Sequence, residues 1–117
     1  MSPSIPITSA QQTALTNYFY TLQSTATAFI TNPSTSNNQA LQTVLNSFYN
    51  FLYDNYSTFP YTTVAYSQYI MLNTIQSLNQ SPISLAQVSQ LLQELTLNLQ
   101  QFVQNIIVDT TTYNTWL

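Results

Sequence analysis

The stretch that decides the fold is residues 85–106, LAQVSQLLQELTLNLQQFVQNI. Its large apolar residues follow one another at alternating steps of three and four: Leu85, Val88, Leu92, Leu95, Leu99, Phe102 and Ile106. This spacing places them on one face of an α-helix and has the period of a heptad seam. Ser84-Leu-Ala-Gln87, directly after Pro82, has the form of a capping box at the start of the helix. The sequence therefore predicts a helix of roughly 23 residues, about 35 Å long.

A similar stripe runs through the first part of the chain. Its members step by four, three, four and three residues: Leu15, Phe19, Leu22, Ala26 and Phe29. Ser9-Ala-Gln-Gln12 has the form of a capping box, so we expect a helix that begins at Thr8 or Ser9. Asn32-Pro33 should end it, because the residue before a proline avoids helical backbone angles.

A second helix is expected after the polar turn NPSTSNN. Ser36-Asn-Asn-Gln39 has the form of its capping box. Its stripe consists of four large residues, widened by two more: Leu41, Leu45, Phe48 and Leu52, with Val44 and Phe51. Because proline cannot continue a helix, Pro60 ends the segment, and the helix should stop near Tyr56.

The third helical segment, about residues 62–79, is less regular. We expect one face to carry Ala65, Tyr69, Leu72 and Ile75, with Val64, Met71 and Leu78 beside it. Tyr66 and Ile70 add apolar surface elsewhere. A helix that is apolar on several sides is usually buried on several sides, so part of this surface is expected to face another subunit.

The two ends of the chain differ from the helices. Residues 1–8, MSPSIPIT, contain two prolines and should form an extended arm. Residues 106–117, IIVDTTTYNTWL, are rich in β-branched residues and should form a tail docked on its own bundle or on a neighbour. The sequence thus predicts an all-α fold, an antiparallel bundle of about four helices over residues 9–105, with an extended N-terminal arm and an apolar C-terminal tail. Strands in the Thr- and Tyr-rich stretches are the alternative.

The composition excludes several classes of function. Charged residues make up 3% of the 117 residues, where about 25% is usual. Lys, Arg, His, Cys and Gly are absent, and Ser, Thr, Asn and Gln account for 57 residues. Without Lys or Arg the chain has no countercharge for phosphates or anionic lipids, so we expect no nucleic acid and no membrane among its partners. No apolar run is long enough to span a bilayer.

Catalysis is also disfavoured. The acidic residues Asp54, Glu94 and Asp109 lie on three different segments, so their spacing brings no two carboxylates together. Serine and threonine nucleophiles need a base, and neither His nor Lys is present. We therefore expect no enzyme activity, no catalytic residue, no cofactor and no metal site.

What remains is a nearly uncharged surface. Low net charge removes the repulsion that keeps proteins apart, and Tyr is enriched at interfaces because its ring packs while its hydroxyl forms hydrogen bonds. The nine tyrosines are either boundary residues of the core or contacts between subunits. The expected subunit contacts come from the arm, the tail and the tyrosines off the main stripes: Ile5, Ile7, Tyr49, Tyr53, Tyr56, Tyr66, Ile107, Tyr113, Trp116 and Leu117.

Residues 5–58 contain IPITSAQQTALTNYFYTLQSTATAFITNPSTSNNQALQTVLNSFYNFL, in which a helix ending in TAFITNP is followed by a short polar turn and QALQTVLNSF. This region resembles the preface region before the collagen-like repeats of Bacillus-group spore-surface (exosporium) proteins. The present chain has no Gly and therefore no Gly-X-Y segment. The resemblance implies a structural protein of the endospore surface, made in the mother-cell cytoplasm without a signal peptide, with other spore-surface proteins as further partners.

Two functional classes follow. The first is a self-assembling structural subunit of an endospore-surface fibre, appendage or layer, whose main partner is itself, as a homo-oligomer or filament. The second is a non-catalytic helical module for binding or adhesion.

Overall fold

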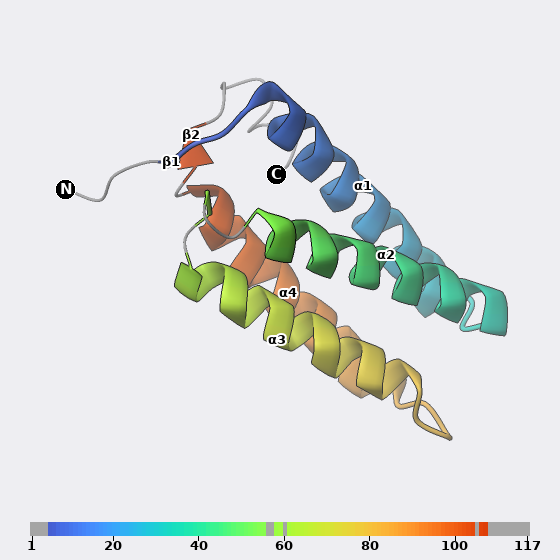
Figure 1. The fold of residues 1–117 in the computed structure, drawn as a ribbon. Helices are drawn as coiled ribbons and strands as arrows, with labels where there is room; N and C mark the ends of the chain where they lie inside the picture. The colour runs from blue at the N-terminus through green and yellow to red at the C-terminus, as the bar shows by residue number, and fades with distance from the viewer. Residues whose placement is uncertain (1–4, 56–57, 60, 105, 108–117) are drawn as a thin grey trace.

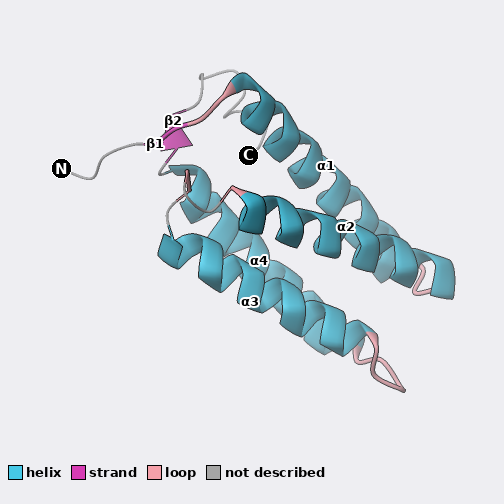
Figure 2. Cartoon of the chain, viewed as in Figure 1, coloured by secondary structure: helices cyan, strands magenta, loops and turns pink. Residues whose placement is uncertain are grey.

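The computed structural model describes residues 5–55, 58–59, 61–104 and 106–107 and shows an all-helical bundle (Figure 1). Its four helices are α1 (Ser9–Thr31), α2 (Thr35–Asp54), α3 (Tyr61–Leu78) and α4 (Leu85–Gln104). Successive helices run back and forth, which confirms the predicted antiparallel bundle (Figure 2). The alternative of strands in the Tyr- and Thr-rich stretches is wrong for residues 61–78, which are helical.

The start of α1 is fixed by Thr8 rather than by Ser9. The Thr8 hydroxyl accepts from the backbone N–H of Gln11 at 3.0 Å, and the Gln11 side chain accepts from the Thr8 N–H at 2.9 Å. This is a capping box shifted by one residue from the expected Ser9-to-Gln12 pair, which is therefore wrong. Gln11 also links the cap to α2, because its Nε2 donates at 2.9 Å to Oδ1 of Asn55, the residue directly after the end of α2.

The turn between α1 and α2 also differs from the expectation in its cap. α1 ends at Thr31, directly before Asn32-Pro33 as predicted, but α2 begins with Ser34 as its N-cap and not with Ser36. Starting at Ser34 places Asn37 within reach of the Ser34 hydroxyl (3.1 Å) and of the Asn32 carbonyl (2.9 Å). The predicted cap of α4 is confirmed, since Ser84 Oγ accepts from the Gln87 N–H at 3.2 Å.

The predicted stripes of α1 and α2 supply a large part of the core, although Phe19 and Ala26 of the α1 stripe are only partly buried. Leu15, Leu22 and Phe29 of α1 are buried, and so are all four principal stripe residues of α2, Leu41, Leu45, Phe48 and Leu52. Phe48 holds the two helices together, because Tyr18 stacks on it at 4.9 Å between ring centroids and Phe19 meets it edge-on at 5.8 Å. Such ring pairs add to the burial of apolar area.

The buried face of α3 is centred beside the predicted one, on Val64, Met71 and Leu78, which were expected at its edge. The residues in the core are spaced by three and four: Val64, Ser67, Met71, Thr74 and Leu78, with Ile70 and Ser77 beside them. Tyr69 and Leu72, which were expected on the buried face, are 60% and 49% exposed. The small hydroxyl residues alternate with the large ones at this seam, so a stripe of large apolar residues alone does not locate it.

The end of α4 also departs from the expected pattern. Val88, Leu95, Leu99 and Phe102 are buried as predicted, whereas Leu92 is half-buried and Leu85 is 39% exposed. Ile106 was expected as the last residue of the helical seam, but α4 ends at Gln104 and Ile106 belongs to a two-residue strand, β2 (Ile106–Ile107). This strand pairs in parallel with β1 (Ile5–Pro6), Ile5 opposite Ile106. After the end of α4, the chain at Ile106–Ile107 is therefore paired with the arm and is not part of the helix.

Candidate functional site

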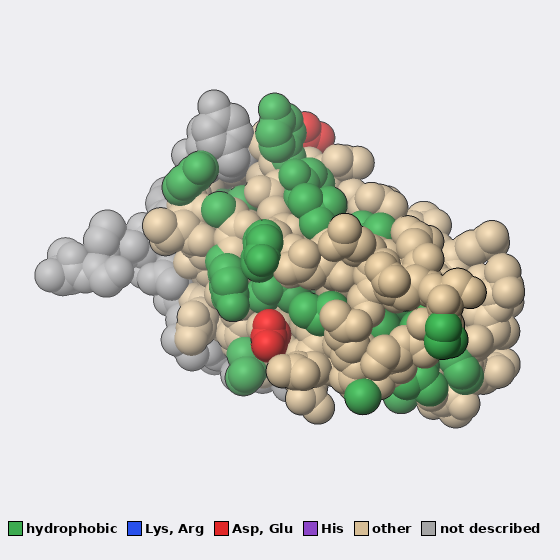
Figure 3. Space-filling model, turned by 90° about the horizontal axis from the view of Figure 1, so that it is seen from below, with side chains coloured by type: hydrophobic (Ala, Val, Ile, Leu, Met, Phe, Trp, Pro, Cys, Tyr) green, Lys and Arg blue, Asp and Glu red, His purple; other side chains and the backbone are tan. Residues whose placement is uncertain are grey.

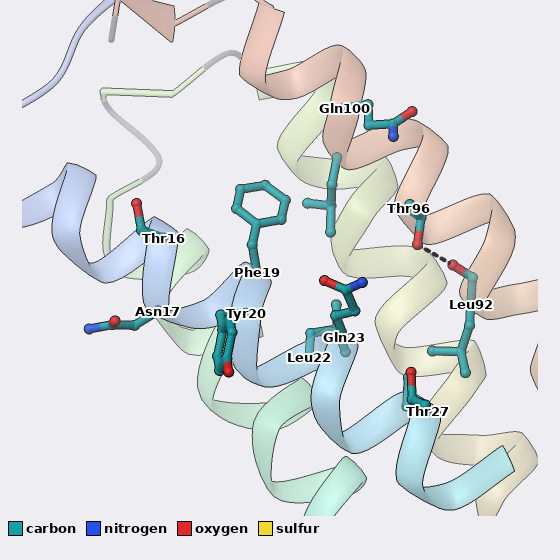
Figure 4. A pocket seen from close by; sticks show the side chains of 12 residues that line it. Thr16, Asn17, Phe19, Tyr20, Leu22, Gln23, Thr27, Leu92, Thr96 and Gln100 are labelled. Atoms are coloured by element: carbon teal, nitrogen blue, oxygen red, sulfur yellow. Dashed lines mark hydrogen bonds between the residues drawn. The ribbon is translucent and has the colours of Figure 1, made fainter. Parts of the chain in front are cut away.

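A hollow with a mainly apolar lining lies between α1 and α4 in the described part of the bundle. Figure 1 shows α3 beside α4 and α1 beside α2, and few residues of α1 and α4 touch. The space between them is a groove of about 540 Å³, here named the α1–α4 groove. The residues that line it are drawn in Figure 4: Thr16, Asn17, Phe19, Tyr20, Leu22, Gln23, Ala26 and Thr27 of α1, and Leu92, Thr96, Leu99 and Gln100 of α4.

The α1–α4 groove has an apolar floor and an uncharged polar rim. Leu22 and Leu99 are buried at its base, and Phe19 is half-buried beside them. Thr96 and Gln100 on α4 are exposed at the rim, and the Thr96 hydroxyl donates to the Leu92 carbonyl at 2.9 Å (Figure 4). No lining side chain carries a charge, so the groove suits an apolar occupant with neutral hydrogen-bonding groups.

A second hollow lies at the turn between α3 and α4. It measures about 590 Å³ and is lined mainly by carboxamides and hydroxyls: Asn73, Gln76, Ser77, Gln80, Pro82, Ser84, Gln87 and Leu91. Ser77 is 3% exposed, and its Oγ has no hydrogen-bond partner among the described residues. This hollow is polar where the α1–α4 groove is apolar.

The solvent side of α3 carries four large exposed side chains. Tyr61, Tyr66, Tyr69 and Leu72, here called the α3 outer face, are 73%, 50%, 60% and 49% exposed. The rings of Tyr66 and Tyr69 stack on each other at 6.3 Å. α3 contains no charged residue, so no charge would have to be desolvated if this face were covered. Figure 3 shows a face of the molecule on which hydrophobic side chains lie among polar ones, with acidic side chains (red) between them.

The expected subunit contacts fall into different environments. Ile7 and Tyr49 are half-buried against the bundle's own core, while Tyr53 and Tyr66 are exposed. The strands of Ile5 and Ile107 pair with each other within the chain. The remaining four expected residues lie outside the described residues: Tyr56, Tyr113, Trp116 and Leu117.

The sequence did not single out Tyr61, Tyr69 and Leu72 as surface residues. Tyr69 and Leu72 were assigned to the buried face of α3 because they are large and share a helical face. Val64, Met71 and Leu78 were expected only beside that face, yet they lie seven residues apart, and this heptad spacing marks the true core face.

The two acidic residues of the described ranges lie exposed on different helices. Asp54 at the end of α2 and Glu94 on α4 are both exposed, and Asp109 lies outside the described residues. Within the described ranges, no three side chains of the His, Cys, Asp or Glu type gather as metal ligands would. None of the described helices combines the length and the apolar character needed to cross a bilayer.

Comparison of the chain with family models, with curated proteins and with solved structures finds no match.

Proposed function

We propose that the protein is a self-assembling structural subunit that forms a homo-oligomer or filament. The observation that carries the proposal is the α3 outer face, where three tyrosines and a leucine are about half or more exposed on a helix without charge. Contiguous exposed apolar side chains mark interaction sites in small proteins, whereas single ones do not.

The chemistry of this face supports association with a second copy. Tyrosine contributes a large ring and a hydroxyl, so a face of tyrosines can pack and form hydrogen bonds with an identical face. The whole chain has a formal net charge of −3 and no basic residue, which leaves little repulsion between copies. A stable interface buries about 800 Å² per partner, so polar neighbours of the α3 outer face would complete the contact.

The proposed place of the assembly is a fibre, appendage or layer at the surface of a bacterial endospore. This part rests on the resemblance of residues 5–58 to the preface region of exosporium proteins, and it makes other spore-surface proteins further partners. An uncharged surface would suit such a structure, because it offers trypsin-like proteases no Lys or Arg to cleave. Immunogold labelling of spores against vegetative cells of the source organism tests the location, and label confined to vegetative cells would contradict it.

The alternative is a non-catalytic binding or adhesion module. The observation that favours it is the α1–α4 groove, whose apolar floor and neutral rim are the features of a ligand site. In that case the protein would act as a monomer or a small oligomer.

The test is the assembly state of two matched leucine variants. Leu72 on the α3 outer face and Leu97 on α4 are both exposed, at 49% and 63%. We expect the wild type to form oligomers or fibres by sedimentation velocity and negative-stain microscopy. Leu72→Glu should disperse them by placing a charge in the contact, and Leu97→Glu should leave them intact. If the wild type stays a monodisperse monomer at high concentration, the proposal of self-assembly is wrong, and the binding or adhesion module is the function that is left.

A further inference from the structure

We propose that the polar hollow of about 590 Å³ at the turn between α3 and α4, here named the α3–α4 hollow, binds a neutral saccharide unit. The inference goes beyond self-assembly and does not depend on it, because none of the four side chains of the α3 outer face lines this hollow. Figure 1 shows the turn at the opposite end of the bundle from β1 and β2.

The walls of the α3–α4 hollow come from one continuous stretch of chain. All of its lining residues lie within 61–104, a range that the structure describes without a gap. On the α3 side the lining runs from Asn73 to Gln80, and on the α4 side it runs from Ser84 to Leu91, at helical spacing on both sides. The volume of the hollow falls within the range of about 300–1,000 Å³ that is usual for small-molecule sites.

Most hydrogen-bonding groups of the hollow are carboxamides. They belong to Asn73, Gln76, Gln80 and Gln87. Each carboxamide offers two donor hydrogens on its nitrogen and an acceptor oxygen. Within the described ranges, none of these four side chains forms a hydrogen bond with another residue. All four carboxamides are therefore available to a ligand.

Ser77 gives a second, independent indication of a ligand. It lines the hollow and is 3% exposed, and its Oγ has no hydrogen-bond partner among the described residues. A buried hydroxyl without a partner costs free energy, which a hydroxyl of a ligand can recover. The Ser77 Oγ is shielded from solvent, so the exposed side chains of Gln76 and Gln80, which change rotamer within nanoseconds, must turn aside to admit the ligand.

The lining selects a ligand without charge. No lining residue is charged, and the chain has no Lys, Arg or His to offset a phosphate or a carboxylate. Glu94 of α4 is exposed and does not line the hollow, and its carboxylate would oppose the approach of an anion. A sugar meets these conditions, because each of its hydroxyls both donates and accepts hydrogen bonds, as carboxamides also do.

The apolar part of the lining favours a sugar over a peptide. Pro82 and Leu91 are the two apolar lining residues, the first exposed and the second half-buried. A sugar ring presents C–H groups between its hydroxyls, and these can pack on two small apolar surfaces among polar groups. A peptide segment would bring apolar side chains that need pockets of their own, and the hollow offers none beyond these two residues.

The test is saturation-transfer difference NMR on the full-length protein. This method observes the ligand, so it works on a monomer and on a large assembly alike. The probes are glucose, galactose and N-acetylglucosamine, with glucuronate as the anionic counterpart of glucose. We expect a neutral sugar to receive saturation with a dissociation constant in the millimolar range, because it replaces water at exposed amides with a small net gain. Glucuronate should bind several-fold more weakly.

Two glutamine variants show whether the sugar occupies the α3–α4 hollow. Gln87 lines the hollow and Gln90 does not, although both are exposed on α4. Gln87→Ala should weaken binding about three- to tenfold, as expected for the loss of one hydrogen bond. It keeps the cap of α4, since Ser84 Oγ accepts from the backbone N–H at position 87. Gln90→Ala should leave binding unchanged, and equal far-ultraviolet circular dichroism shows that both variants are folded.

Four results would overturn the proposal. One is a wild type to which none of the three neutral sugars binds even at high millimolar concentration. Another is a sugar signal that is the same in Gln87→Ala as in the wild type, which places the sugar elsewhere. Glucuronate that binds as tightly as glucose would contradict the neutral class of ligand. Binding of the peptide probe N-acetylglycine methylamide that is lost in Gln87→Ala, without any sugar binding, identifies a peptide group as the occupant.

Discussion

Asn98 of α4 donates a hydrogen bond from its Nδ2 to the Oγ of Ser67 on α3, over 2.6 Å. The same amide group donates to the carbonyl of Thr63, one turn earlier on α3, at 3.1 Å. Ser67 is completely buried and Asn98 is half-buried. A single carboxamide therefore serves two acceptors on the neighbouring helix, and it does so in the core seam, where a large apolar residue would be usual.

Replacing Asn98 should cost more stability than replacing an exposed asparagine. Asn98→Ala removes both hydrogen bonds and leaves Ser67 Oγ without its donor, so we expect a loss of about 1–3 kcal/mol in the free energy of unfolding. Asn46→Ala on the exposed side of α2 should change it by less than about 0.5 kcal/mol. Urea unfolding followed by circular dichroism measures both. Equal values for the two variants would show that the amide bridge contributes nothing.

The same bridge shows why the seam of α3 was misplaced from the sequence. Patterns of large apolar residues located the buried faces of α1 and α2, where leucine and phenylalanine fill the core. In α3 the core positions Ser67 and Thr74 are small and polar, and their hydroxyls are satisfied by Asn98 and by the Ile70 carbonyl. Asn98 comes from another helix, so hydropathy along α3 does not show that Ser67 is buried, whereas Thr74 is satisfied by the carbonyl one turn earlier in α3 itself.

Replacing Ser77 by alanine should raise the free energy of unfolding, whereas replacing Asn98 should lower it. Its hydroxyl is buried and has no partner among the described residues, so Ser77→Ala removes an unsatisfied polar group. We expect a gain of about 1 kcal/mol in unfolding free energy, beyond the gain from the higher helix propensity of alanine. Ser47→Ala, at an exposed position of α2, supplies that propensity term for subtraction. A Ser77→Ala protein no more stable than Ser47→Ala would mean that the hydroxyl is hydrogen-bonded in solution.

The position of the N-cap of α1 predicts different effects on stability for substitutions at two neighbouring residues. Thr8 accepts the Gln11 N–H, while the adjacent Ser9 is already the first residue of α1. Thr8→Ala should therefore destabilise the protein by about 1 kcal/mol, and Ser9→Ala should have almost no effect. The midpoint of thermal unfolding of the two variants decides between them. A larger loss for Ser9→Ala would restore the capping box that the sequence first suggested.

The candidate sites depend on tertiary geometry more than the helices do. Each helix can be predicted from the pattern of its own residues, and Ser84 was correctly predicted as the cap of α4. The α1–α4 groove arises because the two helices bordering it lie apart along their length, and no periodicity within either one encodes that separation. The pairing of Ile5 with Ile106 likewise joins residues from opposite ends of the chain. The sequence predicted an extended arm, and only the folded structure shows what it pairs with.

The stability of this protein should hardly depend on ionic strength. No side-chain ion pair can form, since the sequence contains no Lys, Arg or His, and the described carboxylates Asp54 and Glu94 lie exposed on different helices. Salt then has only weak repulsion among three acidic residues to screen, an effect of a few tenths of a kcal/mol at most. We expect the unfolding temperature to change by less than about 2 °C between low salt and physiological NaCl concentration. Leu97→Lys is the control, because it places a cation three residues after Glu94 and creates a pair worth about 0.2–0.5 kcal/mol that salt weakens. A wild type more sensitive to NaCl than this variant would show that electrostatic interactions, and not the buried stripes and neutral hydrogen bonds, govern the folded state.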